Sequence, residues 1–92
     1  MIKGGDKEVN NQEIRAAILE AAYKAAREAG SIKGGIFSVY EISKDWGEEK
    51  KKIEFNACYL NEKDLVIWVE SGGGMRITAA GVDEYERIHD DQ

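Results

Sequence analysis

The chain has 92 residues, of which 42% are hydrophobic and 34% are charged, and its formal net charge is -5 at pH 7. This length allows one domain, and the composition is that of a folded globular chain rather than a disordered one. No apolar run is long enough to span a bilayer and residues 1–9 lack the apolar core of a signal peptide, so we expect a cytoplasmic protein with no membrane partner. The single cysteine, Cys58, excludes an intramolecular disulfide and a cysteine-rich zinc site.

The acidity increases along the chain. Residues 1–35 carry five acidic and six basic side chains, residues 36–64 carry seven and five, and residues 65–92 carry six and two. Nucleic-acid binding takes much of its free energy from Lys and Arg on phosphates, so the net charge argues against it. A locally basic face is still compatible with the sequence, because Lys50, Lys51 and Lys52 are consecutive.

The first predicted helix follows a flexible lead-in at residues 1–9 and opens a domain that spans residues 10–88. Asn10 and Glu13 have the spacing of a capping box, which predicts that the helix starts there. Helix-forming residues then continue to residue 29, and Gly30 is placed to end the helix.

Two apolar stripes run along this first helix. The main stripe consists of Ile14, Ala17, Ile18, Ala21, Ala22, Ala25 and Ala29, which predicts a close-packed inner face. A weaker stripe of Leu19, Tyr23 and Ala26 points to another side. Either a second element of the same chain covers this weaker stripe, or it forms a dimer contact.

A short second helix is predicted after a glycine-containing connector at residues 30–35. Ile36 and Phe37 fit a very short strand, and Ser38 can cap the helix that follows. The apolar face of this helix carries Val39, Ile42 and Trp46, of which Trp46 would supply a large buried area, and Gly47 ends the helix.

Residues 48–65 form the predicted third helix, with Ile53, Ala57 and Leu60 on one inward stripe. Asp64 tolerates the left-handed conformation that ends such a helix. At 100 degrees per residue, the most outward positions are Lys51, Phe55, Cys58 and Glu62, and they are flanked by Lys52, Asn56 and Tyr59.

A β-hairpin and a short final helix complete the predicted elements. Residues 65–70 are β-branched and aromatic, residues 71–74 are rich in glycine, and residues 75–78 return as a second strand. Thr78 can cap a final helix that carries Val82, Tyr85 and Ile88, and residues 89–92 form a polar tail.

Helix, turn, helix and hairpin in this order resemble the winged helix-turn-helix superfamily, especially its small archaeal and bacterial regulator-like members. The segments that carry the likeness are IFSVYEISKDWGEEKKKIEF, YLNEKDLV and MRITAAGVDEYE, within residues 13–88. The resemblance implies an α+β fold with a three-helix core, a β-hairpin wing and a short C-terminal helix. Glu48 and Glu49 in the turn, Asp64 in place of a frequent Gly and Ala80 in place of a frequent Pro depart from the family's pattern. These departures leave the subfamily, effector and target open.

The resemblance also implies a transcriptional regulator that reads duplex DNA with the helix at residues 50–63 and the wing at residues 70–76. The residues expected to contact DNA are Ser38, Lys50, Lys51, Lys52, Asn56, Tyr59 and Arg76. For Tyr59, packing under the wing is the favoured alternative. For Lys51 and Lys52, a solvated helix start agrees with the sequence equally well.

Phe55, Cys58 and Glu62 are poorly suited to a phosphate-facing surface, because two are apolar and the third is repelled by phosphate. An exposed apolar strip more often marks a protein partner. The alternative is therefore a protein-interaction module on the same fold without DNA binding. Homodimerisation is a further expectation, and the residues predicted for a partner or dimer interface are Leu19, Tyr23, Phe55, Tyr85 and Ile88.

No catalytic constellation emerges from the sequence. His89 is followed only by Asp90 and Asp91, which is too little for a metal site or a triad. Cys58 has no second histidine to activate it. The sequence therefore predicts a protein that is not an enzyme and that has no metal site and no cofactor.

Overall fold

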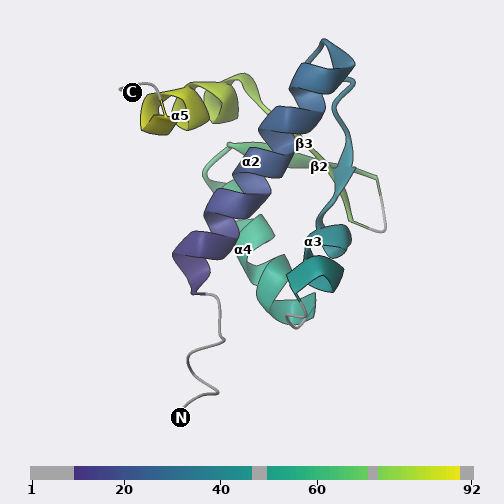
Figure 1. The fold of residues 1–92 in the computed structure, drawn as a ribbon, viewed down its shortest axis with the longest axis vertical. Coiled ribbons are helices and arrows are strands. Elements are labelled where there is room, and N and C mark those ends of the chain that lie inside the picture. The colour runs from purple at the N-terminus through teal and green to yellow at the C-terminus, as the bar shows by residue number, and fades with distance from the viewer. Residues whose placement is uncertain (1–9, 47–49, 71–72, 90–92) are drawn as a thin grey trace.

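A computed structural model describes residues 10–46, 50–70 and 73–89 of the chain (Figure 1). Its elements in chain order are α2 (Asn11–Ala29), β1 (Phe37–Ser38), α3 (Val39–Trp46), α4 (Lys50–Glu62), β2 (Val66–Glu70), β3 (Gly74–Ile77) and α5 (Ala79–His89). The described residues thus form an α+β fold of four helices and one small antiparallel sheet. The expected lead-in at 1–9, the turn at Gly47, the side chain of Trp46 and residues 90–92 of the expected tail lie outside the described residues.

Helix α2 begins and ends where its sequence predicts. The Glu13 N–H donates to Asn10 Oδ1 at 2.8 Å, and the Asn10 N–H donates to Glu13 Oε1 at 3.2 Å, so the capping box is complete. Gly30 takes the left-handed conformation, with φ of 75°, and ends the helix. Both ends therefore satisfy backbone groups that the helix cannot pair internally.

The sheet has the strand order β1-β3-β2, and both pairings are antiparallel. The short strand expected at residues 36–37 lies one residue later, where Phe37 pairs with Met75. In the hairpin, Val66 pairs with Ile77 and Trp68 pairs with Met75. The pairing of β1 with β3 joins the segment before α3 to the returning strand of the hairpin, so the two helices between β1 and β2 are held against the sheet.

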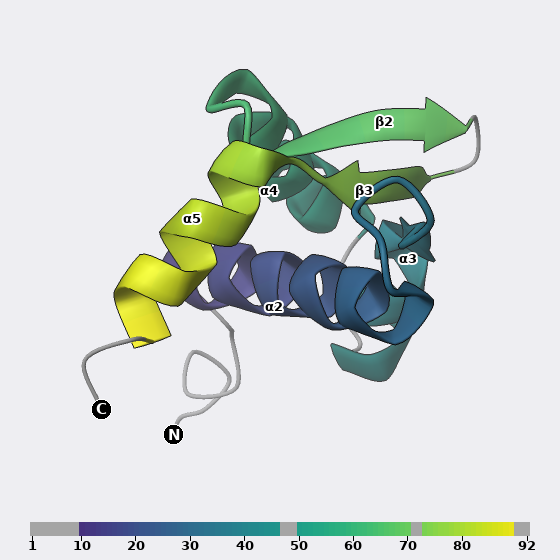
Figure 2. The ribbon, with the colours of Figure 1, turned by 90° about the horizontal axis from the view of Figure 1, so that it is seen from above.

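The core lies where α2 meets β3, α4 and α5 (Figures 1 and 2). Its buried hydrophobic residues are Ile14, Ile18, Leu19, Ala22, Ala26, Val39, Ile53, Ala57, Leu60, Val66, Met75 and Ile77. Ala29, which the main stripe of α2 includes, is exposed, whereas Leu19 and Ala26 of the weaker stripe are buried. The inner face of α2 is therefore wider than the predicted stripe, because α5 covers a second side of this helix.

The first turn of α5 is fixed to the segment between α4 and β2. Thr78 Oγ accepts a hydrogen bond from the Gly81 N–H at 3.0 Å, so Thr78 caps the helix as predicted. A Cβ at Gly81 would lie 2.1 Å from the backbone oxygen of Leu65, so the two backbones touch here. Asp64 precedes this contact with a φ of 64°, which confirms the predicted left-handed end of α4.

Among the described residues, none of the helices combines the length and the apolar character needed to cross a bilayer.

Candidate nucleic-acid interface

Helix α4 has the two faces that its sequence predicts. Ile53, Ala57 and Leu60 are buried in the core. The four positions predicted to point outward, Lys51, Phe55, Cys58 and Glu62, are all exposed. The Phe55 side chain is 60% exposed, the largest exposed fraction among the exposed large hydrophobic residues. The outer face therefore combines one lysine with an apolar strip.

The first turn of α4 carries positive charge. Lys50, Lys51 and Lys52 begin the helix, and no acidic residue lies within its first turn. Lys50 and Lys51 are exposed and Lys52 is half-buried. The Nζ of Lys50 lies 4.4 Å from the centroid of the Tyr40 ring of α3. Because the positive end of the helix dipole is also here, the exposed Lys50 and Lys51 favour the approach of an anion.

Asn56 was expected to reach base edges, and this expectation is wrong. The residue is fully buried, and its side chain hydrogen-bonds to two residues of α2. Its Oδ1 accepts from Arg15 Nε at 2.8 Å, and its Nδ2 donates to Asn11 Oδ1 and to the Lys52 backbone oxygen, each at 3.0 Å. Asn56 lies three residues after Ile53 and four before Leu60, so it continues the inward stripe as a polar anchor.

Tyr59 remains accessible at the edge of α4. Its side chain is 38% exposed. The guanidinium carbon of Arg15 lies 3.6 Å from the ring centroid and Lys63 Nζ lies 5.9 Å from it. The contact with Arg15 places the ring beside α2. No local sequence pattern predicts the contact of Arg15 with Tyr59. The contact of Tyr59 with Lys63, which lies four residues later and directly follows α4, could have been expected from that spacing.

The side chains of Ser38 and Arg76 both form hydrogen bonds with backbone groups. Ser38 is half-buried in β1, and its Oγ accepts from the Tyr40 N–H at 3.3 Å, which caps the start of α3. Arg76 lies between the buried residues Met75 and Ile77, so strand alternation places it on the opposite, outer face of the sheet. Its Nη1 donates to the Ile77 backbone oxygen at 3.1 Å. Arg76 is thus half-buried along the hairpin.

The expected dimer contacts are largely occupied within the chain. Leu19 is only 4% exposed and belongs to the core, so its expected place in an interface is wrong. Tyr23 stacks on Tyr85 of α5 with ring centroids 4.2 Å apart, and its hydroxyl donates to Glu86 at 2.9 Å. Of the two explanations for the weaker stripe of α2, coverage by another element of the chain is therefore the one observed. Ile88 remains 49% exposed.

One contact between α3 and α4 was not predicted from the sequence. The Tyr40 hydroxyl donates to a carboxylate oxygen of Glu54 at 2.5 Å. This hydrogen bond, followed by burial and the negative charge of Glu54, raises the pKa of Tyr40 above its usual value. A Cβ at Gly73 would meet the same ring at 2.5 Å, so the start of the returning strand lies directly against Tyr40.

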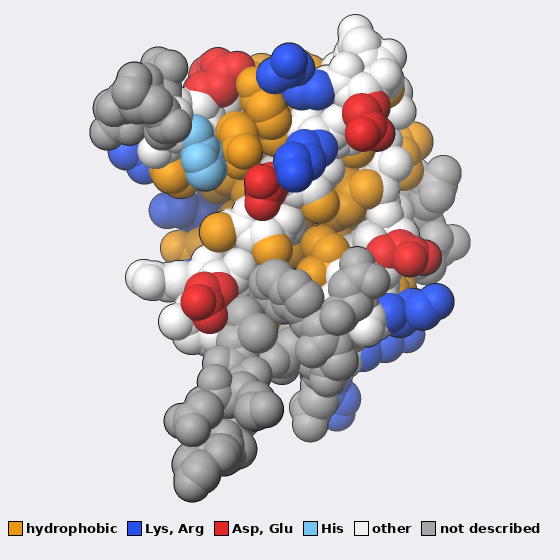
Figure 3. All heavy atoms as spheres, in the orientation of Figure 1, with side chains coloured by type: hydrophobic (Ala, Val, Ile, Leu, Met, Phe, Trp, Pro, Cys, Tyr) orange, Lys and Arg blue, Asp and Glu red, His pale blue; other side chains and the backbone are white. Residues whose placement is uncertain are grey.

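The surface around these residues is mixed in charge. In Figure 3, hydrophobic side chains gather along α2, with single acidic and basic side chains scattered among them, and Lys and Arg side chains gather at the lower right. Figure 1 places α3 and the start of α4 in that part of the view. Among the described residues, no three His, Cys, Asp or Glu side chains are grouped so that they could hold a metal ion.

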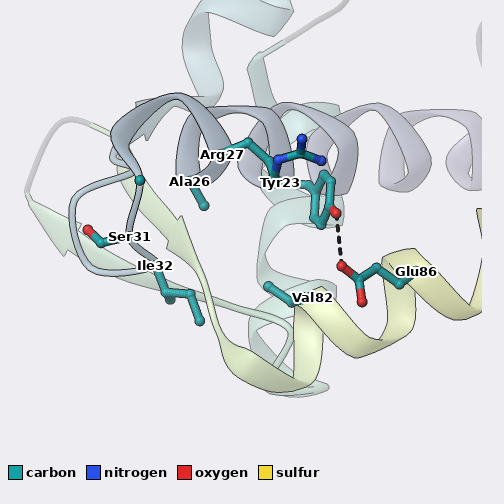
Figure 4. A pocket seen from close by; sticks show the side chains of 8 residues that line it. Tyr23, Ala26, Arg27, Ser31, Ile32, Val82 and Glu86 are labelled. Atoms are coloured by element: carbon teal, nitrogen blue, oxygen red, sulfur yellow. Dashed lines mark hydrogen bonds between the residues drawn. The ribbon is translucent and has the colours of Figure 1, made fainter.

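Among the described residues, one cavity of about 510 Å³ beside α5 is lined by Tyr23, Arg27, Tyr85, Glu86 and His89. Two further cavities also lie beside α5. The first, of about 340 Å³, is formed by the C-terminal end of α2, the following connector and α5; Figure 4 shows Tyr23, Arg27 and Glu86 at its wall. The second, of about 380 Å³, lies between the N-terminal half of α2, the end of α4 and α5.

Comparisons with protein-family models, with curated proteins and with solved structures give no match.

Proposed function

We propose that this chain is a winged helix-turn-helix domain that binds duplex DNA through the first turn of α4. The order of elements, α2-β1-α3-α4-β2-β3-α5, and the strand order β1-β3-β2 support this architecture. Helices α3 and α4 pack against each other, and β2 and β3 form a hairpin beside them. In such a domain the exposed side of α4 is the surface offered to the major groove.

The observation that carries the proposal is the run of three lysines in the first turn of α4. The exposed Lys50 and Lys51 add positive charge to the positive end of the helix dipole, and this combination attracts an anion. DNA phosphates supply that anion, and backbone N–H groups at a helix N-terminus can contribute further bonds. Lys50 and Lys51 are exposed and suited to this role.

The burial of Asn56 limits how the helix could read bases. On the outer face of α4, Phe55 and Tyr59 are the exposed aromatic side chains. An apolar side chain in the major groove contacts the methyl group of thymine, whereas phosphate contacts carry no sequence information. We therefore expect binding that depends mainly on charge and that prefers A·T pairs weakly.

The test is a salt series with a fluorescent random duplex, measured by polarisation. The logarithm of the binding constant should fall with the logarithm of salt, and Lys50→Gln and Lys51→Gln should each reduce the magnitude of the slope by about 0.9. Lys33→Gln, at an exposed position in the connector after α2, is the matched control and should leave the slope unchanged. Absence of binding at low salt, or equal slopes for all variants, would overturn the proposal.

Glu48 and Glu49 precede the lysines in the sequence. Their carboxylates repel phosphate, so the double variant Glu48→Gln and Glu49→Gln should bind the random duplex more tightly than the natural chain at every salt concentration. Unchanged affinity would show that phosphates do not approach this turn.

A second candidate function is protein binding through the same helix. It is favoured by the 60% exposure of Phe55 on the outer face and by the exposed Cys58 and Glu62 beside it. Phe55→Glu should then abolish capture of a partner from cell extract while the far-ultraviolet circular dichroism spectrum stays unchanged. Equal capture by both proteins would contradict this candidate.

A further inference from the structure

The cavity between α2, α4 and α5 has a polar rim and an apolar floor. Its lining residues are Gln12, Arg15, Ala16, Leu19, Tyr59, Leu60, Lys63, Leu65, Glu84 and Ile88. Its volume of about 380 Å³ lies at the lower end of the range found for small-molecule sites. Three helices contribute to it, so a bound molecule would contact segments that are far apart in the sequence.

Arg15 is held in a fixed position at the rim. Its Nε donates to Oδ1 of the buried Asn56, and its guanidinium lies 3.6 Å above the Tyr59 ring. These two contacts orient the planar group before any ligand arrives, which lowers the entropic cost of binding. Among the described residues, the hydrogen bond through Nε is the one that Arg15 makes, so its terminal amino groups can take a further acceptor.

A second cation stands at the same rim. Lys63 Nζ lies 5.9 Å from the centroid of the Tyr59 ring, so Arg15 and Lys63 both lie next to this side chain. The acidic residue of the rim, Glu84, is already bound through both carboxylate oxygens to Arg87, at 3.1 and 2.7 Å. The Arg87 contact and, to a smaller extent, the charge of Lys63 hold the pKa of Glu84 below its usual range. The rim is therefore positive.

The floor of the cavity is hydrophobic. Leu19 and Leu60 are buried beneath it, Leu65 is half-buried, and Ile88 is 49% exposed at its edge. An inorganic anion would lose hydration at such a surface and gain little from it. A neutral apolar molecule would gain nothing from the charges of Arg15 and Lys63 at the rim.

We propose that this cavity binds a small amphipathic carboxylate, in which Arg15 and Lys63 hold the carboxylate and the leucine floor with Ile88 holds an apolar or aromatic group. A ligand of about ten non-hydrogen atoms matches a cavity of this size. The cavity of Figure 4 does not share this chemistry, because the lining residues that the structure describes combine a single cation, Arg27, with the acidic Glu86, whose carboxylate accepts a hydrogen bond from Tyr23. The cavity between α2, α4 and α5 shares Tyr59 with the proposed DNA-facing side of α4, so ligand binding is tested without DNA.

The test is a titration of the isotope-labelled full chain, followed by two-dimensional 1H–15N NMR. The probes are 3-phenylpropanoate, its uncharged analogue 3-phenylpropanamide, and inorganic phosphate. We expect 3-phenylpropanoate to give saturable shifts in the amide signals of Ala16, Tyr59, Lys63 and Ile88. The amide should bind at least tenfold more weakly, because it lacks the charge-assisted hydrogen bonds, and phosphate should give no saturable shift at the floor.

Variants locate the site. Lys63→Gln, at an exposed position, should weaken binding of 3-phenylpropanoate several-fold, and Ile88→Asp should weaken it at least tenfold by removing apolar surface and adding a negative charge. Lys24→Gln on the exposed side of α2 is the control and should not change the affinity. Arg15→Gln is a further variant, and Lys63→Gln keeps the test valid if that variant does not fold.

Three results would overturn the proposal: equal affinity for acid and amide, saturable shifts confined to residues outside this cavity, or no shift at millimolar probe. Equal binding of phosphate and 3-phenylpropanoate would likewise exclude the apolar part of the site.

Discussion

Helix α2 is joined to α4 and to α5 by contacts of opposite character. Toward α4, the contact is a buried amide, Asn56, which hydrogen-bonds to Arg15 and Asn11. Toward α5, it is a half-exposed aromatic stack of Tyr23 on Tyr85, extended by His89 at a centroid distance of 4.1 Å. A buried polar group is costly when it loses its partners, whereas a partly solvated stack loses only its own modest attraction. We therefore expect α4 to be fixed and α5 to open locally.

The largest effect should follow from Asn56→Ala. The change creates a small cavity and removes the hydrogen bonds that Asn56 forms with Arg15 and Asn11 of α2. We therefore expect the free energy of unfolding to fall by about 3 kcal/mol. Urea denaturation followed by circular dichroism measures it. Asn61→Ala, at a half-buried position on the same helix, is the control. Equal stabilities of the two variants would remove the contrast between the two contacts.

Gly81→Ala should have the next largest effect. The added Cβ would lie 2.1 Å from the Leu65 backbone oxygen and 2.6 Å from Ile77 Cγ1, so α5 would have to shift away from the sheet. We expect the free energy of unfolding, measured by urea denaturation, to fall by about 2 kcal/mol. The neighbouring exposed Ala80 offers Ala80→Ser as a control. If the free energy of unfolding of Gly81→Ala equals that of the natural chain, α5 moves freely even at its first turn.

Tyr85→Leu should lower the free energy of unfolding by less, about 1 kcal/mol, because it removes the aromatic stack but keeps apolar surface. Hydrogen exchange should become faster in α5 and stay unchanged in α4. Faster exchange in both helices would show that the two contacts of α2 are coupled rather than independent.

The smallest effect concerns Tyr40 and pH. Its pKa is raised chiefly by the hydrogen bond to Glu54, so the folded pKa lies above the unfolded value of about 10. The contribution to stability is complete below pH 10 and is lost as the pH rises through the folded pKa. Thermal unfolding between pH 8 and 11 should thus show a smaller alkaline decline for Tyr40→Phe than for the natural chain. The Tyr59→Phe variant is the control, and parallel declines in all three proteins would contradict the assignment.

Local contacts could be predicted from the sequence. The capping box of Asn10 and Glu13, the left-handed Gly30 and Asp64, and the cap at Thr78 each involve residues within a few positions of one another. Their geometry depends on the backbone of one element, so short-range spacing is sufficient to find them.

The burial of Asn56 could not be predicted in the same way. Its partner Arg15 lies 41 residues earlier and Asn11 lies 45 residues earlier, so no local spacing relates them. Periodicity placed Asn56 beside the most outward positions of the helix, and only the tertiary contacts with α2 show that it is buried. Leu19 was assigned to the wrong surface for a related reason, because the position of α5 over α2 depends on the tertiary fold.

The central position of α2 has a consequence for synthesis of the chain. This helix is translated before β3 and α5, yet it packs against both of them. Because domains fold during translation as units, its apolar side must stay without its final neighbours until the hairpin and α5 have left the ribosome. We therefore expect a nascent chain stalled before residue 74 to leave Ile14, Ile18 and Ala22 without part of their final cover.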